Sequence, residues 1–266
     1  MKEKIFSKLE IVIFILALVG IWLTSFYENY ALFHSVAEIF SIVIAVGIFM
    51  IAWNSRFFVD NDYLLFLGIS LVFIASIDFV HLLAYQGINI FSGFDANLPT
   101  QLWIAARYLQ ALSFLVAPIF IIRELKPKLT SLIYFIITSF IFVSIFYLRI
   151  FPDAFIVDSG LTQFKIISEY IISIILIGSI VFLWEYKEKF DKIIFYLIIS
   201  SIIFTIFAEL AFTFYVSVFG LSNLVGHFFK IISFYLIYKA IIQIGLMNPY
   251  SLLSKKKIKR KKNGFN

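Results

Sequence analysis

The stretch YLLFLGISLVFIASIDFVHLLAY, residues 63–85, decides the fold class of this chain. It is an almost unbroken apolar run, and a helix needs about 20 such residues to cross the hydrocarbon core of a bilayer. Similar runs follow one another along the 266 residues, of which 62% are hydrophobic and 14% charged. The alternation typical of a membrane β-barrel is absent from these runs. The sequence therefore predicts an all-α, polytopic membrane protein.

The apolar runs predict eight transmembrane helices separated by short polar breaks. Lysine and arginine are concentrated in the N-terminus, in the second, fourth and sixth breaks, and in the C-terminal tail, with Arg149 and Lys165 as exceptions in the fifth break. The positive-inside rule then places both termini in the cytoplasm, in the plasma membrane of a prokaryote. The predicted spans are roughly 9–27, 33–53, 63–84, 101–122, 129–149, 164–184, 192–219 and 224–245.

Composition also limits the partners and the kinds of metal site. We expect one membrane domain, residues 1–253, followed by a basic tail, residues 254–266. A basic cluster beside a transmembrane helix favours anionic lipid, so lipid rather than nucleic acid is the expected partner of the tail. The chain has no cysteine, which excludes disulfides and thiolate metal sites.

Asp78 and His81 raise the question of function, because they lie on one helix face inside an apolar span. A charge at mid-bilayer costs about 2.5–3.5 kcal/mol on insertion scales, so such groups are expected to face one another. Lys239 lies near the cytoplasmic boundary, where its amine is expected to snorkel. Nine other ionisable residues inside the predicted spans fall in the outer half of the bilayer: His34, Glu38, Asp78, His81, Arg107, Glu169, Glu209, His227 and Lys230.

Two interpretations of this polar layer remain open. In the first, His34, His81 and His227 bind a metal, because imidazole and carboxylate together suit zinc, iron or copper. Haem is a variant that requires two of these histidines to meet. The surrounding ligand-binding residues are then Glu38, Asp78, Arg107, Glu169, Glu209 and Lys230. In the second, the cations neutralise the acids, and the histidines are packing residues; Tyr85 and Trp103 belong to the interfacial aromatic belt.

Several motifs occur in an order that carries a resemblance to a known family. They are His34 with Glu38, Asp78 with His81, the block WIAARY at 103–108, and a closing pair of His227 and Lys230 before NPY at 248–250. In this order they resemble the third type of bacterial and archaeal membrane-associated sensor (MASE) domain, over roughly residues 10–253. The matching polar positions are His34, Glu38, Asp78, His81, Arg107, His227 and Lys230.

The resemblance implies a sensory input domain without enzymatic activity of its own. In that family the membrane domain usually precedes an output module, such as a histidine kinase or a diguanylate cyclase. After MNPYSLL this chain continues only into the basic tail. We therefore expect either a stand-alone sensor that signals through a separate cytoplasmic partner or a truncated multidomain sensor, and a homodimer remains open. The alternatives are an intramembrane metal hydrolase, with a zinc-bound water as nucleophile, and an ion- or proton-coupled transporter.

Overall fold

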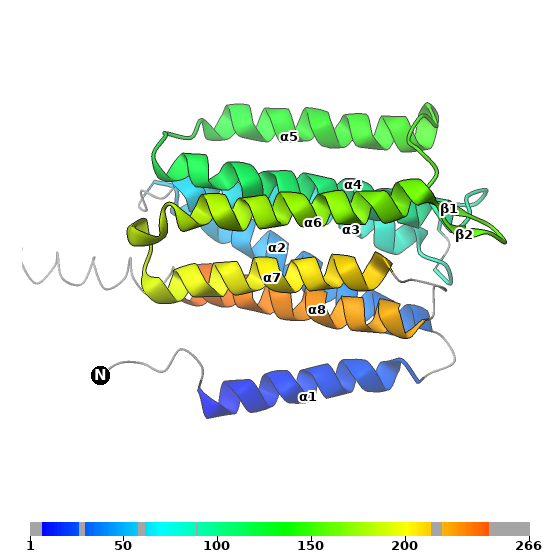
Figure 1. Cartoon of the computed structure of the whole chain (residues 1–266), viewed down its shortest axis with the longest axis horizontal. Helices are drawn as coiled ribbons and strands as arrows, with labels where there is room; N and C mark the ends of the chain where they lie inside the picture. The colour runs from blue at the N-terminus through cyan, green and yellow to red at the C-terminus, as the bar shows by residue number, and fades with distance from the viewer. Residues whose placement is uncertain (1–6, 27–29, 58–61, 89, 214–219, 245–266) are drawn as a thin grey trace, which may run out of the picture.

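The computed structural model describes residues 7–26, 30–57, 62–88, 90–213 and 220–244. The predicted basic tail and the NPY sequence lie outside the described residues. Within these residues the fold is a bundle of long helices with one two-stranded hairpin (Figure 1). The helices are α1 (Lys8–Thr24), α2 (Tyr30–Ser55), α3 (Asp62–Ala84), α4 (Asn97–Val116), α5 (Pro127–Phe142), α6 (Gln163–Trp184), α7 (Lys192–Thr213) and α8 (Leu221–Tyr238).

Shorter elements extend or connect these helices. Antiparallel strands β1 (Phe155–Ile156) and β2 (Gly160–Leu161) form the hairpin between α5 and α6. We call the end of the bundle that carries this hairpin and the loop 85–96 the hairpin end; by the predicted topology it is the outer end. The tighter or wider helical turns are η1 (Ala117–Ile121), η2 (Val143–Tyr147), η3 (Lys187–Lys189) and η4 (Lys239–Ile244).

The predicted all-α, multi-pass fold is confirmed. Among the described residues, seven helices are long and apolar enough to cross a membrane, namely α2 to α8 with the turns that extend them. The remaining helix, α1, has 17 residues and buries none of them. It lies at the edge of the bundle (Figure 1), where Phe14 stacks on Tyr235 at a ring-centroid distance of 3.9 Å and Glu10 pairs with Lys239.

Six of the described helices form a closed ring around the molecular core. In ring order they are α2, α3, α4, α6, α7 and α8, and α8 packs back against α2. Helix α5 packs outside the ring against α3, and α1 packs outside it against α2. A polar group on the inner face of any ring helix is therefore shielded from lipid and faces groups from the other helices.

Small residues allow the close packing that this ring needs. A Cβ added at Gly68 of α3 would lie 2.6 Å from the Ala52 Cβ and 3.4 Å from the Ile48 carbonyl oxygen of α2. Small residues at such contacts let two transmembrane backbones approach closely. Gly68 lies at such a contact with α2.

Two helix boundaries differ from the predicted ones because of proline. Helix α4 begins at Asn97, before the predicted start at 101, and places Pro99 in its first turn, where a missing N–H costs nothing. The same helix ends at Val116 and tightens into η1 around Pro118, which cannot continue the α-helical hydrogen bonding. The Asn97 side chain also anchors the hairpin, accepting a 2.8 Å hydrogen bond from the Ala154 N–H.

Candidate functional site

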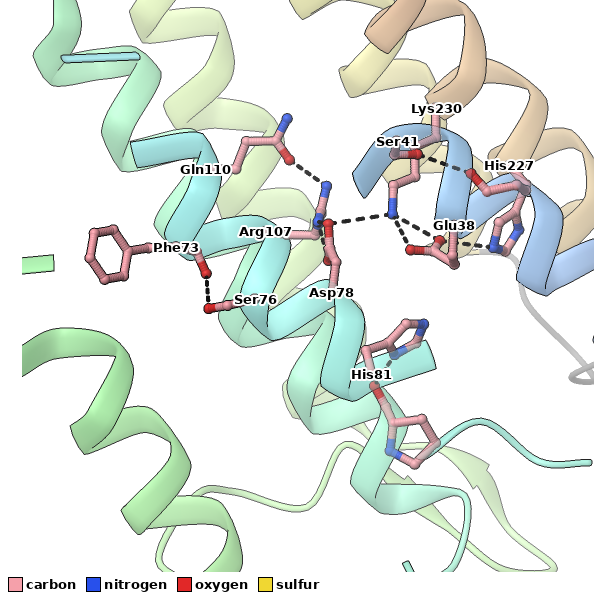
Figure 2. A network of polar contacts seen from close by, with 12 residues as sticks. Glu38, Ser41, Phe73, Ser76, Asp78, His81, Arg107, Gln110, His227 and Lys230 are labelled. Atoms are coloured by element: carbon pink, nitrogen blue, oxygen red, sulfur yellow. Dashed lines mark hydrogen bonds and ion pairs between the residues drawn. The ribbon is translucent and has the colours of Figure 1, made fainter. Parts of the chain in front are cut away.

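Two buried ion pairs occupy the inside of the ring toward the hairpin end. Arg107 Nη2 of α4 lies 2.5 and 2.6 Å from the two carboxylate oxygens of Asp78 on α3. Lys230 Nζ of α8 lies 2.8 and 2.7 Å from the two oxygens of Glu38 on α2. Figure 2 shows Lys230 between the two acids, with Asp78 Oδ2 at 3.6 Å. These four residues, which we call the ion quartet, balance two negative charges with two positive ones.

The ion quartet is covered by the face of Trp103. The Trp103 ring centroid lies 4.7 Å from Arg107 Cζ and 4.6 Å from Lys230 Nζ, so one indole contacts both cations. A cation over an indole face is stabilised by the ring quadrupole, most strongly where water is excluded. The predicted role of Trp103 in an interfacial belt was therefore wrong. The indole is buried because α4 turns this side of the WIAARY block toward the inside of the ring.

The three histidines converge next to the ion quartet, each from a different helix. His81 Nε2 on α3 lies 3.2 Å from His34 Nε2 on α2. The ring of His34 stacks on Tyr85 at a centroid distance of 3.5 Å and meets the ring of His227 of α8 edge-on at 4.9 Å. All three imidazoles are buried. Tyr85, which the sequence assigned to the aromatic belt, instead forms one wall of this group.

Hydrogen bonds to backbone carbonyls determine which ring nitrogens carry protons. His81 Nδ1 lies 2.7 Å from the Pro99 carbonyl oxygen, and His227 Nδ1 lies 2.8 Å from the Asn223 carbonyl oxygen. A carbonyl only accepts, so both Nδ1 atoms are donors and, in the neutral rings, both Nε2 atoms carry lone pairs. His34 Nε2 must then donate to His81 Nε2, which leaves the lone pair of the neutral His34 ring on Nδ1.

This proton arrangement leaves two unpartnered imidazole lone pairs, of which the one on His227 lies beside the Glu38 carboxylate. His34 Nδ1 and His227 Nε2 are buried without a hydrogen-bond partner, and His227 Nε2 lies 3.4 Å from Glu38 Oε1. One donor atom from each of His34, Glu38 and His227 falls within 4.8 Å of the others, a grouping that suits a metal ion. The three predicted metal ligands are thus brought together, but this grouping contains Glu38 in place of His81, which instead contacts His34.

A cavity of about 60 Å³ connects the histidines with the hairpin end. It extends from the buried His34, His81 and His227 to Gln86, which is exposed, and to Leu161 on the hairpin. A water molecule occupies about 10–15 Å³ on this measure, so the cavity suits a small ion with a few waters. The cavity is too small for a haem.

The predicted site residues Glu169 and Glu209 form a second group, between α6 and α7. Lys165 belongs to the same group, with Nζ 2.6 Å from Glu169 Oε1 and 2.9 Å from the Phe212 carbonyl oxygen. The sequence placed Lys165 in a polar break. Its buried position is explained by its spacing of four residues from Glu169, which puts both on one helix face, and this spacing was the signal that could have found it.

Lys239 also differs from its prediction. Its side chain is fully buried and forms an ion pair with Glu10 of α1, rather than reaching toward the membrane surface. The pair lies at the start of η4, where α8 widens into a π-helical turn. A buried ammonium without a carboxylate would be costly, so Glu10 provides a reason for α1 to lie against the C-terminal part of α8.

The sequence was then compared with known families, curated proteins and solved structures. The model of the membrane-associated sensor domain MASE3 matches residues 25–249, most of the chain. The chain belongs to this family. The searches of curated proteins and of solved structures gave no match. As a MASE3 domain with seven candidate spans, the protein is a multi-pass membrane sensory input domain, and α1 lies before the matched region.

Proposed function

We propose that this MASE3 domain senses a divalent transition-metal cation, which binds to His34 Nδ1, His227 Nε2 and a Glu38 oxygen. The observation that carries the proposal is the pair of unpartnered imidazole nitrogens on His34 and His227, two histidines that group with Glu38 and line the cavity. Two imidazoles and a carboxylate suit zinc, copper and iron. Three protein donors leave a further coordination position for water, on the side of the cavity.

His81 supports this site without being a ligand in the arrangement described. It accepts from His34 Nε2 and is itself held by the Pro99 carbonyl. A histidine ligand commonly donates its second N–H to such a partner, which fixes the ring and makes it more basic. The hydrogen bond from His227 to the Asn223 carbonyl has the same form.

Lys230 gives the site two states that a cation would distinguish. In the structure its ammonium contacts both Glu38 oxygens, so a metal ion and Lys230 compete for the same carboxylate. Asp78 Oδ2, at 3.6 Å, is a second acceptor toward which Lys230 would move when a metal occupies Glu38. Both His227 and Lys230 are on α8, so binding acts directly on the helix that runs to η4. We propose that α8 passes this change to a cytoplasmic output partner such as a kinase or a cyclase.

The contacts favour sensing over the two alternatives. A metal hydrolase would need Asp78 as a ligand or base, but Asp78 is engaged by Arg107 and Lys230. A transporter would need polar groups along the whole length of the helix bundle, from one membrane surface to the other. Among the described residues, the buried charges all lie toward the hairpin end, apart from Lys239, which pairs with Glu10.

Metal content of the purified full chain in lipid nanodiscs tests the proposal. After equilibration with Zn²⁺, Cu²⁺ or Ni²⁺ and gel filtration, we expect one ion per chain in the wild type. His34→Ala and His227→Ala should lose the ion, and His81→Ala should bind it about 10–100-fold more weakly. Lys230→Met should bind more tightly, because it removes the competitor for Glu38.

Glu185→Gln, which changes an exposed acid on the far side of the bundle, serves as the matched control and should retain the ion. The proposal fails if the loaded wild type is metal-free, or if folded His34→Ala and His227→Ala proteins hold as much metal as the wild type. A stable thermal melting profile for each variant in nanodiscs shows that a loss of metal is not a loss of fold.

A further inference from the structure

The second buried group has more acids than cations. Glu169 on α6 and Glu209 on α7 are 0% and 1% exposed. The two carboxyl groups interact across the contact between α6 and α7. Arg107, the cation of the neighbouring ion quartet, already contacts both oxygens of Asp78. Lys165 is therefore the counter-charge for two carboxylates, and one negative charge in this part of the described structure is left without a cation of its own.

This pair also has fewer hydrogen-bond donors than buried oxygens. Oε2 of Glu169 and Oε2 of Glu209 are buried without a hydrogen-bond partner, and Oε1 of Glu169 has the Lys165 ammonium at 2.6 Å. Two ionised carboxylates offer only acceptors to each other and repel, and in a buried site one of them is strongly driven to take up a proton. A single proton supplies the missing donor and removes the surplus charge at the same time.

We propose that Glu169 and Glu209 form a proton-binding site, in which the two carboxyl groups share one proton in an O–H···O hydrogen bond. Lys165 holds Glu169 in place through its 2.6 Å contact. This site is separate from the proposed metal site and does not depend on it. It adds a second input, the proton concentration on the side of the hairpin end.

The cavity gives the pair a route to that side. Lys165 lines the cavity together with Phe212, and the Lys165 ammonium contacts both the Glu169 carboxylate and the Phe212 carbonyl. The charged or titratable groups on the elements packed around the pair belong to it or contact other residues. Lys165 on α6 belongs to the pair, and Arg107 on α4 pairs with Asp78. On α8, His227 and Lys230 contact Glu38, and Lys239 in η4 pairs with Glu10.

Infrared difference spectroscopy of the reconstituted full chain tests the site directly. A protonated carboxylic acid has a C=O stretch that is separate from the carboxylate bands and shifts in D₂O. We expect the metal-free wild type to show such a band at neutral pH and to lose it at alkaline pH. Glu209→Gln and Glu169→Gln should each abolish the band, while Glu185→Gln on the exposed end of α6 should retain it.

Glu209→Gln is the milder variant, since it leaves the Lys165–Glu169 ion pair intact and its amide can donate to Glu169. The inference is overturned if the folded wild type shows no protonated acid at neutral pH, or if the band persists in both glutamine variants. Because the spectra are recorded without metal, this result is independent of the metal-content experiment. Loss of metal binding in the histidine variants with the band retained would support both sites separately.

Discussion

The ion quartet and the Glu169–Glu209 pair lie toward the same end of one helical ring. They differ in how their buried carboxylates are neutralised. In the ion quartet every acid meets a cation from another helix, and all four residues are almost fully buried. In the acid pair two carboxylates share Lys165. A charge-matched group is therefore sensitive to the loss of either partner, whereas a group with a surplus carboxylate can accept an added cation or proton.

Breaking the ion quartet should have the largest effect. Asp78→Asn leaves the Arg107 guanidinium buried without a carboxylate, and we expect a loss of about 3–5 kcal/mol in the free energy of unfolding. Steric trapping in bicelles measures this free energy for a membrane protein. Asp158→Asn is the matched control, because Asp158 is exposed and its φ of 68° is a conformation that asparagine also adopts.

The double variant Asp78→Asn with Arg107→Gln tests whether the unpaired charge of Arg107 causes this loss of stability. Removing the stranded guanidinium should recover much of the lost stability, since a buried ion pair replaced by neutral groups is often tolerated. Equal destabilisation in the single and the double variant would mean that packing, rather than the unpaired charge, sets the cost.

Weakening the aromatic cover of the ion quartet should have an intermediate effect. Trp103→Leu removes the indole face that contacts Arg107 and Lys230, and we expect a loss of about 2 kcal/mol. Trp103→Phe should lose less, because it keeps an aromatic face for the two cations. Trp22→Leu, on the exposed surface of α1, should leave the free energy of unfolding nearly unchanged, and a similar loss there would argue against the cation–π contribution.

The smallest effect is expected in the acid pair. Glu209→Gln removes the surplus charge and replaces the shared proton with an amide donor, so the free energy of unfolding should stay within about 1 kcal/mol of the wild type. Asp78→Asn also removes one buried carboxylate, so the difference between the two variants measures the effect of a paired cation. A loss as large as that of Asp78→Asn would mean that Glu209 is paired like the acids of the ion quartet.

The sequence was sufficient to predict the helical membrane fold and the common depth of the polar residues. Both depend on quantities that can be read along one helix: the length of an apolar run and the cost of a charge at a given depth. The helix ends were less well predicted. Helix α4 starts earlier than expected, with Pro99 in its first turn, and its Asn97 side chain accepts a hydrogen bond from the backbone beside the hairpin. Depth also identified Glu169 and Glu209, which no motif had indicated.

Depth along a helix does not determine which residues meet. The sequence provided four acids and could not assign Arg107 to Asp78 or Lys230 to Glu38, because the pairing depends on the order of the helices around the ring and on their rotation. The same geometry decided that Trp103 lies under two cations. The helix arrangement also brings His81 of α3 to His34 of α2. Because His34 Nε2 donates to His81, the lone pair of His34 is on Nδ1. Contacts between helices are three-dimensional, so only the tertiary structure decided them.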